Sequence, residues 1–217
     1  MIRLLVANPR YSSWSLRGWL AVKQSGLPHA TEWVNLYADD WQQRRAQPDI
    51  AVADGKVPVL HDGDVVAWNA LGIIGWLDAQ SGGTRFWPAD PAARAFAQSV
   101  AAEMQGGFQA LRQNCPTNFV RVYPGRPAPA AISADVARID RLWSTAIDRF
   151  GGPWLGGAGW GGADIMFAPV ASRFTTYDIA LSPAAEAYRQ RAMGHPLVAE
   201  WLALAQADPV LNPAYEF

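Results

Sequence analysis

A largely apolar run at residues 2–7 constrains the fold of this chain more than any other feature. The run stops at Asn8-Pro9 and lacks the alternation of a half-exposed strand, so it predicts a central strand with both faces buried. Apolar residues then recur at helical spacing over residues 13–22, and Gly26 is well suited to end that helix. With a second strand predicted over residues 31–36, the chain opens with a β-α-β unit whose crossover is right-handed.

Residues 57–77 predict a hairpin followed by a helix. Two short apolar runs, 57–60 and 64–67, flank a turn that contains Gly63. Pro58 is tolerated there because it stands at the start of its strand. A helical pattern follows and stops before the Ser-Gly-Gly at residues 81–83. The first 81 residues therefore carry a mixed α/β pattern.

From residue 90 onward only helical patterns remain. The first stripe comprises Phe96, Val100, Met104, Phe108, Leu111 and Cys115, and the second comprises Val136, Ile139, Leu142, Trp143, Ile147 and Phe150. A later helix is predicted to open near Asp164, with Gly161 as its N-cap and the carboxylate bonding back to the cap. We expect an α/β domain at 1–81, a linker at 82–89 and an all-helical domain at 90–217.

Composition excludes several classes of function. The 217 residues include 18 basic and 19 acidic residues, with only two lysines, so no basic stripe predicts a nucleic-acid partner. The first apolar run is too short for a signal or a membrane span, and we expect a cytoplasmic protein. One cysteine, Cys115, and three scattered histidines predict neither a disulfide framework nor a metal site. Cys115 is interpreted as a buried hydrophobe, and the glycine-rich residues 151–162 as a tight loop rather than a phosphate cradle.

Four local motifs carry a resemblance to a known family. They are Tyr11-Ser12-Ser13-Trp14-Ser15-Leu16-Arg17, Gly55-Lys56-Val57-Pro58-Val59-Leu60, Trp68-Asn69-Ala70-Leu71-Gly72-Ile73-Ile74 and Gly162-Ala163-Asp164-Ile165-Met166-Phe167-Ala168-Pro169. In this order they resemble the cytosolic glutathione transferases. The Ser12-Ser13 pair followed by Arg17 is similar to the serine-type members, including the zeta class with its maleylacetoacetate isomerases. The resemblance implies a thioredoxin-like N-terminal domain, an all-α C-terminal domain and a homodimer.

The same resemblance implies that glutathione is the co-substrate and a small hydrophobic electrophile its partner. A thiol with a pKa of about 8.5 is mostly protonated at neutral pH, so such an enzyme must stabilise the thiolate. By position, Ser12 matches the activating hydroxyl, with Ser13 next and Tyr11 third. A serine before a helix is equally well explained as an N-cap, and this alternative stays open for Ser12.

For glutathione binding, the resemblance implies main-chain pairing at Val57 before a cis Pro58, with Lys56 and Trp14 nearby. Asn69-Ala70 stands where the family has an acidic residue or glutamine followed by serine. Asn69 brings no charge and Ala70 offers only its amide, so the site is weakened or Asn69 is a plain N-cap. The alternative to a transferase is therefore a non-catalytic binding or regulatory protein with the same fold.

The second substrate is expected between the two domains. Met104, Phe108 and Arg112 follow one another at a spacing of four residues, and Arg173 with Tyr177 repeats that spacing. Such stripes line a pocket in this hypothesis, although core packing explains them as well.

Overall fold

The computed structural model describes residues 1–126 and 129–217. Its N-terminal part contains a four-stranded sheet of β1 (Ile2–Ala7), β2 (His29–Val34), β3 (Val59–Asp62) and β4 (Val65–Trp68) in the order β2-β1-β3-β4. β1 pairs in parallel with β2, whereas β3 is antiparallel to both β1 and β4. The second strand begins and ends two residues earlier than predicted, because its parallel register with β1 starts at His29 opposite Ile2.

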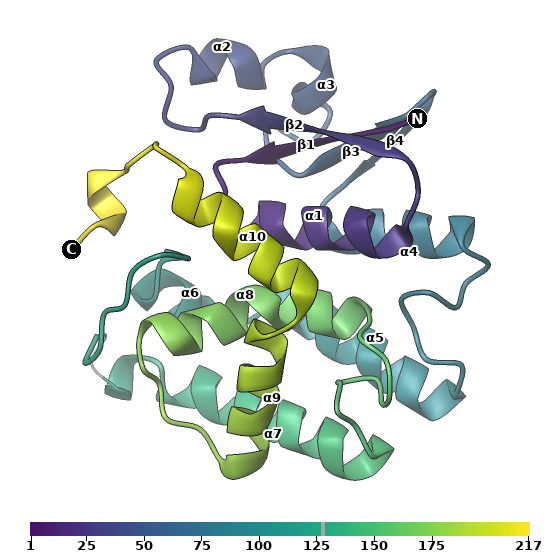
Figure 1. Ribbon diagram of the computed structural model, residues 1–217, viewed down its shortest axis with the longest axis vertical. Coiled ribbons are helices and arrows are strands. Elements are labelled where there is room, and N and C mark those ends of the chain that lie inside the picture. Colours follow the sequence, from purple (N-terminus) through teal and green to yellow (C-terminus); the bar gives the residue numbers. More distant parts are fainter. Residues whose placement is uncertain (127–128) are drawn as a thin grey trace.

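Both faces of β1 are buried, as the sequence predicts. Leu4 and Val6 point into the main core, while Leu5 and Ala7 join Ile50 in a smaller cluster on the opposite face. α1 (Ser13–Ser25) and α4 (Ala70–Gln80) cover the first face, and α2 (Trp41–Arg45) and α3 (Pro48–Ala51) lie over the second (Figure 1). This is a thioredoxin-like arrangement, and it places the start of α1 directly after the central strand.

α1 begins and ends where its sequence predicts. Gly26 adopts a left-handed conformation with φ 69° and donates its amide to the Lys23 carbonyl, which closes the last turn. Inside the helix, Gly18 permits a close approach, because a Cβ built on it lies 2.6 Å from the Pro58 Cβ. The loop before β3 therefore packs directly against α1.

The C-terminal part is helical, as expected. It contains α5 (Pro91–Gly106), α6 (Gln109–Asn114), α7 (Ser133–Phe150), α8 (Gly162–Thr176), α9 (Pro183–Met193) and α10 (Pro196–Ala207), with short 3-10 turns η1 (Pro129–Ala131) and η2 (Pro213–Tyr215). α8 is almost entirely buried and packs against α1, α5 and α9. α10 crosses α1 and contacts it, and the two parts share one hydrophobic core (Figure 1).

The stripe predicted over residues 96–115 is not one helix. α5 ends at Gly106, and Phe108 takes a left-handed conformation with φ 58° before α6 begins. Gly107 is needed at the break, because a Cβ there lies 2.7 Å from the Glu103 carbonyl oxygen. Met104 and Arg112 consequently lie on different helices, which corrects the predicted continuous spacing.

The N-terminus of α8 has the predicted cap. The Gly161 amide donates to Asp164 Oδ2 at 2.9 Å, and Asp164 Oδ1 accepts from the Leu155 amide and the Tyr188 hydroxyl, each at 3.0 Å. Asp164 is fully buried, and this burial raises the pKa of its carboxyl to about 6. The glycine-rich loop thus anchors a helix.

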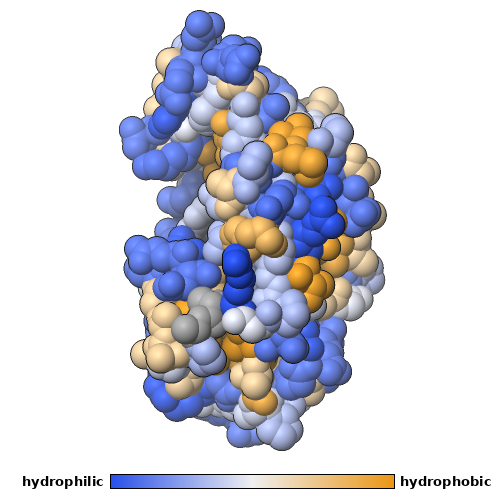
Figure 2. All heavy atoms as spheres, turned by 90° about the vertical axis from the view of Figure 1, so that its left-hand side faces the viewer, coloured by the Kyte–Doolittle hydropathy of each residue, from blue (hydrophilic) through white to orange (hydrophobic). Residues whose placement is uncertain are grey.

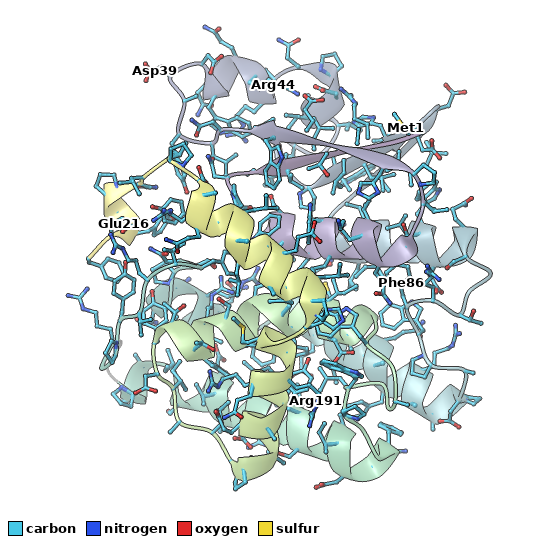
Figure 3. All side chains as sticks on the ribbon, in the orientation of Figure 1. Met1, Asp39, Arg44, Phe86, Arg191 and Glu216 are labelled. Carbon is cyan, nitrogen blue, oxygen red and sulfur yellow. The ribbon has the colours of Figure 1, made fainter. Side chains whose placement is uncertain are left out.

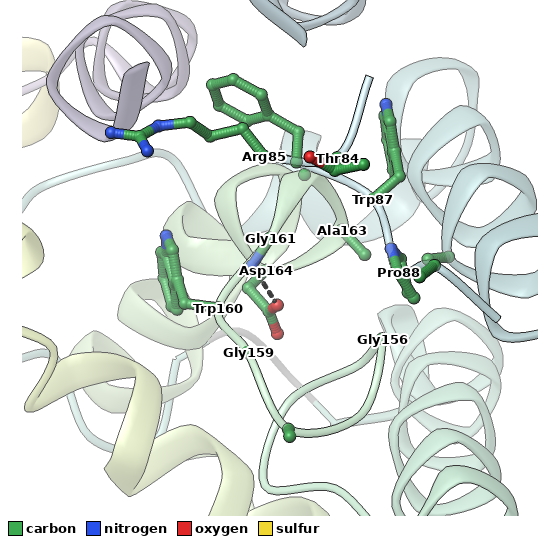
Figure 4. Close-up of a pocket in the computed structure, with 15 residues that line it drawn as sticks. Thr84, Arg85, Trp87, Pro88, Gly156, Gly159, Trp160, Gly161, Ala163 and Asp164 are labelled. Atoms are coloured by element: carbon green, nitrogen blue, oxygen red, sulfur yellow. Dashed lines mark hydrogen bonds between the residues drawn. The ribbon is translucent and has the colours of Figure 1, made fainter. Parts of the chain in front are cut away.

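A cavity of about 300 Å³ lies beside this cap, between the interdomain linker and the glycine-rich loop (Figure 4). None of the predicted site residues lines it. The face of the molecule that Figure 2 shows mixes hydrophilic and apolar residues. No helix of the described residues is long and apolar enough to cross a membrane.

Candidate functional site

A second cavity, of about 460 Å³, brings together six of the predicted site residues from the start of α1, the loop before β3 and the start of α4. The described residues that line it are Ser12, Trp14, Leu36, Trp41, Arg45, Ala53, Gly55, Lys56, Val57, Pro58, Trp68, Asn69 and Gln105. Gln105 comes from α5, so the helical domain closes one side. The cavity therefore lies at the boundary of the two domains.

Ser12 is both the N-cap of α1 and the hydroxyl that lines this cavity. Its Oγ accepts the Ser15 amide at 3.3 Å and donates to Ser15 Oγ at 2.8 Å. Capping uses a lone pair of Ser12, whereas thiol activation uses its hydrogen, so the two roles do not compete. The interpretations that seemed exclusive from the sequence are compatible.

Ser15 supports Ser12 from inside the fold. It is completely buried, and its Oγ also accepts the Ala7 amide at 2.8 Å. A run of hydrogen bonds thus links the end of β1 to the cavity through two hydroxyls. Sequence analysis did not single out Ser15; its position three residues after the cap was the only available signal.

The Val57-Pro58 peptide bond is cis, as the resemblance implies. The β3 pairing begins at Val59, and neither the amide nor the carbonyl of Val57 has a partner in the hydrogen bonds of the described residues. Main-chain groups without partners at the end of a strand offer a short peptide a place to pair.

Asn69 is the N-cap of α4, with φ 52° and its Oδ1 accepting the Gly72 amide at 2.9 Å. Oδ1 therefore caps the helix, and Nδ2 makes none of the hydrogen bonds of the described residues. Leu71 donates its amide to Gln105 Oε1 at 3.3 Å. Within residues 1–126 and 129–217, the Ala70 amide has no partner, and it adds a donor at the positive end of a helix.

The charges around the cavity are positive. Lys56 and Arg45 line it, and none of the lining residues that the structure describes is acidic. Lys56 forms an exposed ion pair with Asp54 at 2.7 Å, which constrains it little. The cavity suits a ligand with more than one carboxylate.

Tyr11 and Ser13 do not line this cavity. The Tyr11 hydroxyl donates to Glu216 Oε1 at 2.7 Å and accepts the Asn212 amide at 3.1 Å, which ties it to the C-terminal tail. Glu216 is labelled in this tail in Figure 3. Burial raises the pKa of the Tyr11 phenol to about 12. The Ser13 side chain is buried and accepts from Arg173 Nη2 at 3.4 Å. Consecutive residues at the start of α1 thus face different parts of the molecule.

Three of the residues predicted for the second substrate lie elsewhere. Met104 and Phe108 are buried in the core, where the Phe108 ring packs near Phe167. The Tyr177 hydroxyl donates to the Pro116 carbonyl at 2.8 Å, and its side chain borders a separate cavity of about 710 Å³. Packing within the helical domain explains the positions of these three side chains. Arg112 and Arg173 lie near Trp14 and Ser13, although neither lines the 460 Å³ cavity.

The sequence missed Leu36, Trp41, Arg45, Ala53 and Gln105 as lining residues. The first four belong to the segment between β2 and β3, whose short helices gave no periodic signal. Gln105 lies near the end of α5 and reaches the cavity only because the domains pack together.

A four-stranded thioredoxin-like sheet joined to a helical domain, with a hydroxyl-lined cavity at their boundary, defines the class of the glutathione transferases. A family model described as "Glutathione S-transferase, N-terminal domain" matches residues 11–80, and one described as "Glutathione S-transferase, C-terminal domain" matches residues 129–204. The chain belongs to the glutathione S-transferase family.

The sequence identity between this chain and individual relatives is low. Glutathione S-transferase GstB of Escherichia coli (strain K12) is 29% identical over 119 residues, an alignment that spans 54% of this chain and 57% of that relative. A glutathione transferase homologue from Burkholderia with bound glutathione superimposes with a TM-score of 0.68 at 21% identity, covering 95% of this chain and 98% of the other. The theta-class enzyme of Xanthomonas axonopodis pv. citri with glutathione bound gives 0.66 at 20% identity, covering 93% and 96%. These two structures share the fold of this chain.

Proposed function

We propose that this chain binds glutathione in the 460 Å³ cavity that Ser12 lines, which we call the Ser12 cavity. There it activates the glutathione thiol for attack on a small electrophilic or unsaturated molecule. The observation that carries the proposal is the convergence of three groups on one cavity: the Ser12 hydroxyl, the Val57 main chain and the N-terminus of α4. The glutathione-bound relatives with this fold support it.

Each part of glutathione has a complementary group. The cysteinyl main chain pairs with the amide and carbonyl of Val57. The γ-glutamyl carboxylate accepts from the Ala70 amide and Asn69 Nδ2 at the start of α4. The glycine carboxylate meets Lys56 and Arg45, the two cations at the cavity. These contacts use groups that the protein's own hydrogen bonds leave available or hold only weakly.

Ser12 stabilises the sulfur anion. Its hydrogen turns from Ser15 to the sulfur, and the Ser15 hydroxyl turns to donate to Ser12 Oγ, so that both hydroxyl hydrogens have an acceptor. The hydrogen bond and the N-terminus of α1 each contribute about 1 kcal/mol, which together lower the thiol pKa by somewhat more than one unit. The thiolate then forms a C–S bond, and a leaving group departs with its electron pair or an unsaturated carbon takes up a proton.

Maleylacetoacetate-type isomerisation, a homodimer and a cytoplasmic location stay predictions from the resemblance. The competing function, a binding protein without turnover, is favoured by the uncharged Asn69, whose carbonyl oxygen already caps α4.

A titration of tryptophan fluorescence with glutathione tests the site, because Trp14 and Trp68 line the cavity. We expect saturation in the low millimolar range or below, and turnover of 1-chloro-2,4-dinitrobenzene that falls tenfold or more in Ser12→Ala. Ser13→Ala is the matched neighbour and is expected to retain turnover. Binding without turnover indicates the binding protein, and no saturable change refutes the proposal.

A further inference from the structure

Three arginines gather where α1, α6 and α8 meet. The Arg17 guanidinium lies 4.4 Å from the centre of the Trp14 ring, and that of Arg112 lies 4.8 Å from it. Arg173 reaches the same region from α8, since its Nη2 donates to Ser13 Oγ at 3.4 Å. We call Arg17, Arg112 and Arg173 the arginine cluster.

Among the described residues, no carboxylate pairs with the arginine cluster. Arg17 donates to the carbonyls of Met166 and Ser13, and Arg112 to those of residues 105 and 107. Arg173 donates to the carbonyls of residues 115 and 169 as well as to the Ser13 hydroxyl. In contrast, six other arginines form ion pairs within the described residues, namely Arg3, Arg10, Arg44, Arg121, Arg138 and Arg189.

The positive charge of the cluster is buried as well as unneutralised. Arg17 is 1% exposed and Arg173 6% exposed, and Arg17 Nη2 has no hydrogen-bond partner in the described part of the chain. Burial, and then repulsion from the other arginines, lowers the pKa of the Arg17 guanidinium. Buried charges are strongly unfavourable without a partner of opposite sign.

Hydrogen bonding between the two domains does not explain why three charged side chains lie in this region. The 2.8 Å bond from Arg17 Nε to the Met166 carbonyl does link α1 to α8. A neutral amide side chain makes such a bond without the cost of burying a cation. The arginine cluster lacks a negative charge beside it, and a bound anionic ligand would supply one.

None of the three arginines is among the described residues that line the Ser12 cavity, but two of its lining residues contact the cluster. Trp14, which contacts two of the arginines, lines that cavity, and so does Gln105, whose carbonyl accepts from Arg112 Nη1 at 3.3 Å. Arg112 is half-buried, whereas Arg17 and Arg173 are enclosed. Arg112 is therefore the member that a ligand meets first, and the other two add to the positive potential behind it.

We propose that the electrophile carries an acidic group, and that the arginine cluster binds this group while the ring or double bond lies against Trp14. This inference rests on the proposed glutathione transferase function and specifies its second substrate as an anion. Arg112 is the residue that contacts the acidic group, because a guanidinium matches a carboxylate in shape and charge.

Two electrophiles that differ only in charge test the proposal: 4-chloro-3,5-dinitrobenzoate and 4-chloro-3,5-dinitrobenzamide. With rates normalised to the uncatalysed reaction with glutathione, we expect kcat/KM to favour the acid tenfold or more. Arg112→Gln is expected to reduce this preference at least tenfold, and Arg112→Lys to restore part of it. Arg138→Gln, which removes an exposed arginine paired with Glu103, is the matched control and is expected to leave both rates unchanged.

Two results overturn the inference. The first is that the wild type prefers the amide or shows no preference between the two compounds. The second is that Arg112→Gln lowers the rates with both compounds equally, which would mean that the cluster stabilises the glutathione thiolate or the fold.

Calorimetric titration without glutathione keeps the inference separate from the proposed function. We expect 3,5-dinitrobenzoate to bind and 3,5-dinitrobenzamide to bind at least tenfold more weakly, with the difference lost in Arg112→Gln. If glutathione fails to bind while this difference persists, the proposed function fails and the anion site stands. Equal binding of the two compounds refutes the anion site itself.

Discussion

Removing the Ser15 hydroxyl tests whether the hydrogen bonds behind Ser12 serve catalysis. In Ser15→Ala, Ser12 loses its 2.8 Å hydroxyl partner, and the buried Ala7 amide loses its acceptor. Without a donor behind it, the Ser12 oxygen is a weaker support for the thiolate. A loss of about 1 kcal/mol raises the pKa of the bound thiol by about 0.7 units and lowers the thiolate fraction about fivefold below that pKa.

A second serine of α1 provides the control. Ser25 is buried, donates to the Val22 carbonyl at 2.6 Å and accepts the Leu27 amide at 3.1 Å. Ser15→Ala and Ser25→Ala each leave a backbone amide without its acceptor, so both are expected to cost about 1–3 kcal/mol of folding free energy. Only Ser15→Ala is expected to change the pKa of the bound glutathione thiol.

Ultraviolet absorbance of the thiolate, titrated with pH in the presence of saturating glutathione, measures the pKa, and urea denaturation measures stability. If the two variants lose similar stability and shift the thiol pKa equally, or not at all, Ser15 has only a structural role. A shift in Ser15→Ala that Ser15→Thr reverses supports the positioning role.

Three further predictions follow from individual contacts. Gly18→Ala places a Cβ 2.6 Å from the Pro58 Cβ and displaces the loop that is proposed to pair with glutathione. KM for glutathione is therefore expected to rise several-fold while kcat changes less, and steady-state kinetics measure both. Because burial raises the pKa of Asp164 to about 6, the folded state binds its proton more tightly than the unfolded state, and this contribution to stability is lost as pH rises through 6. When the pH is lowered from 7 to 5, the free energy of unfolding of the wild type in urea denaturation is expected to rise by about 1 kcal/mol relative to that of Asp164→Asn. If the free energies of unfolding of the two proteins change in parallel with pH, this prediction is wrong. Tyr11→Phe breaks the bonds to Glu216 and Asn212 and is expected to lower stability by about 1–3 kcal/mol while thiol transfer stays within twofold; a tenfold loss of activity at unchanged stability makes Tyr11 the activating group instead.

The sequence alone determined the features that depend on neighbouring residues. The apolar run at residues 2–7 identified the central strand, and Ser12 and Gly26 marked the ends of α1 through their capping chemistry. Gly161 and Asp164 fixed the start of α8 in the same way. Such signals are readable because both partners of each hydrogen bond lie within one turn of the chain.

Only the tertiary structure decided which side chains reach the cavity. Tyr11, Ser12 and Ser13 are consecutive, yet only Ser12 lines it, because the direction of each side chain is set by how α1 packs between the sheet and α8. Likewise Arg112, from the helical domain, lies over the Trp14 ring, and Gln105 joins Trp14 in lining the cavity, although both are more than 90 residues from Trp14 in sequence. Periodicity records which residues are buried but not what they are buried against, so the unneutralised arginine cluster became visible only once the two domains were placed together.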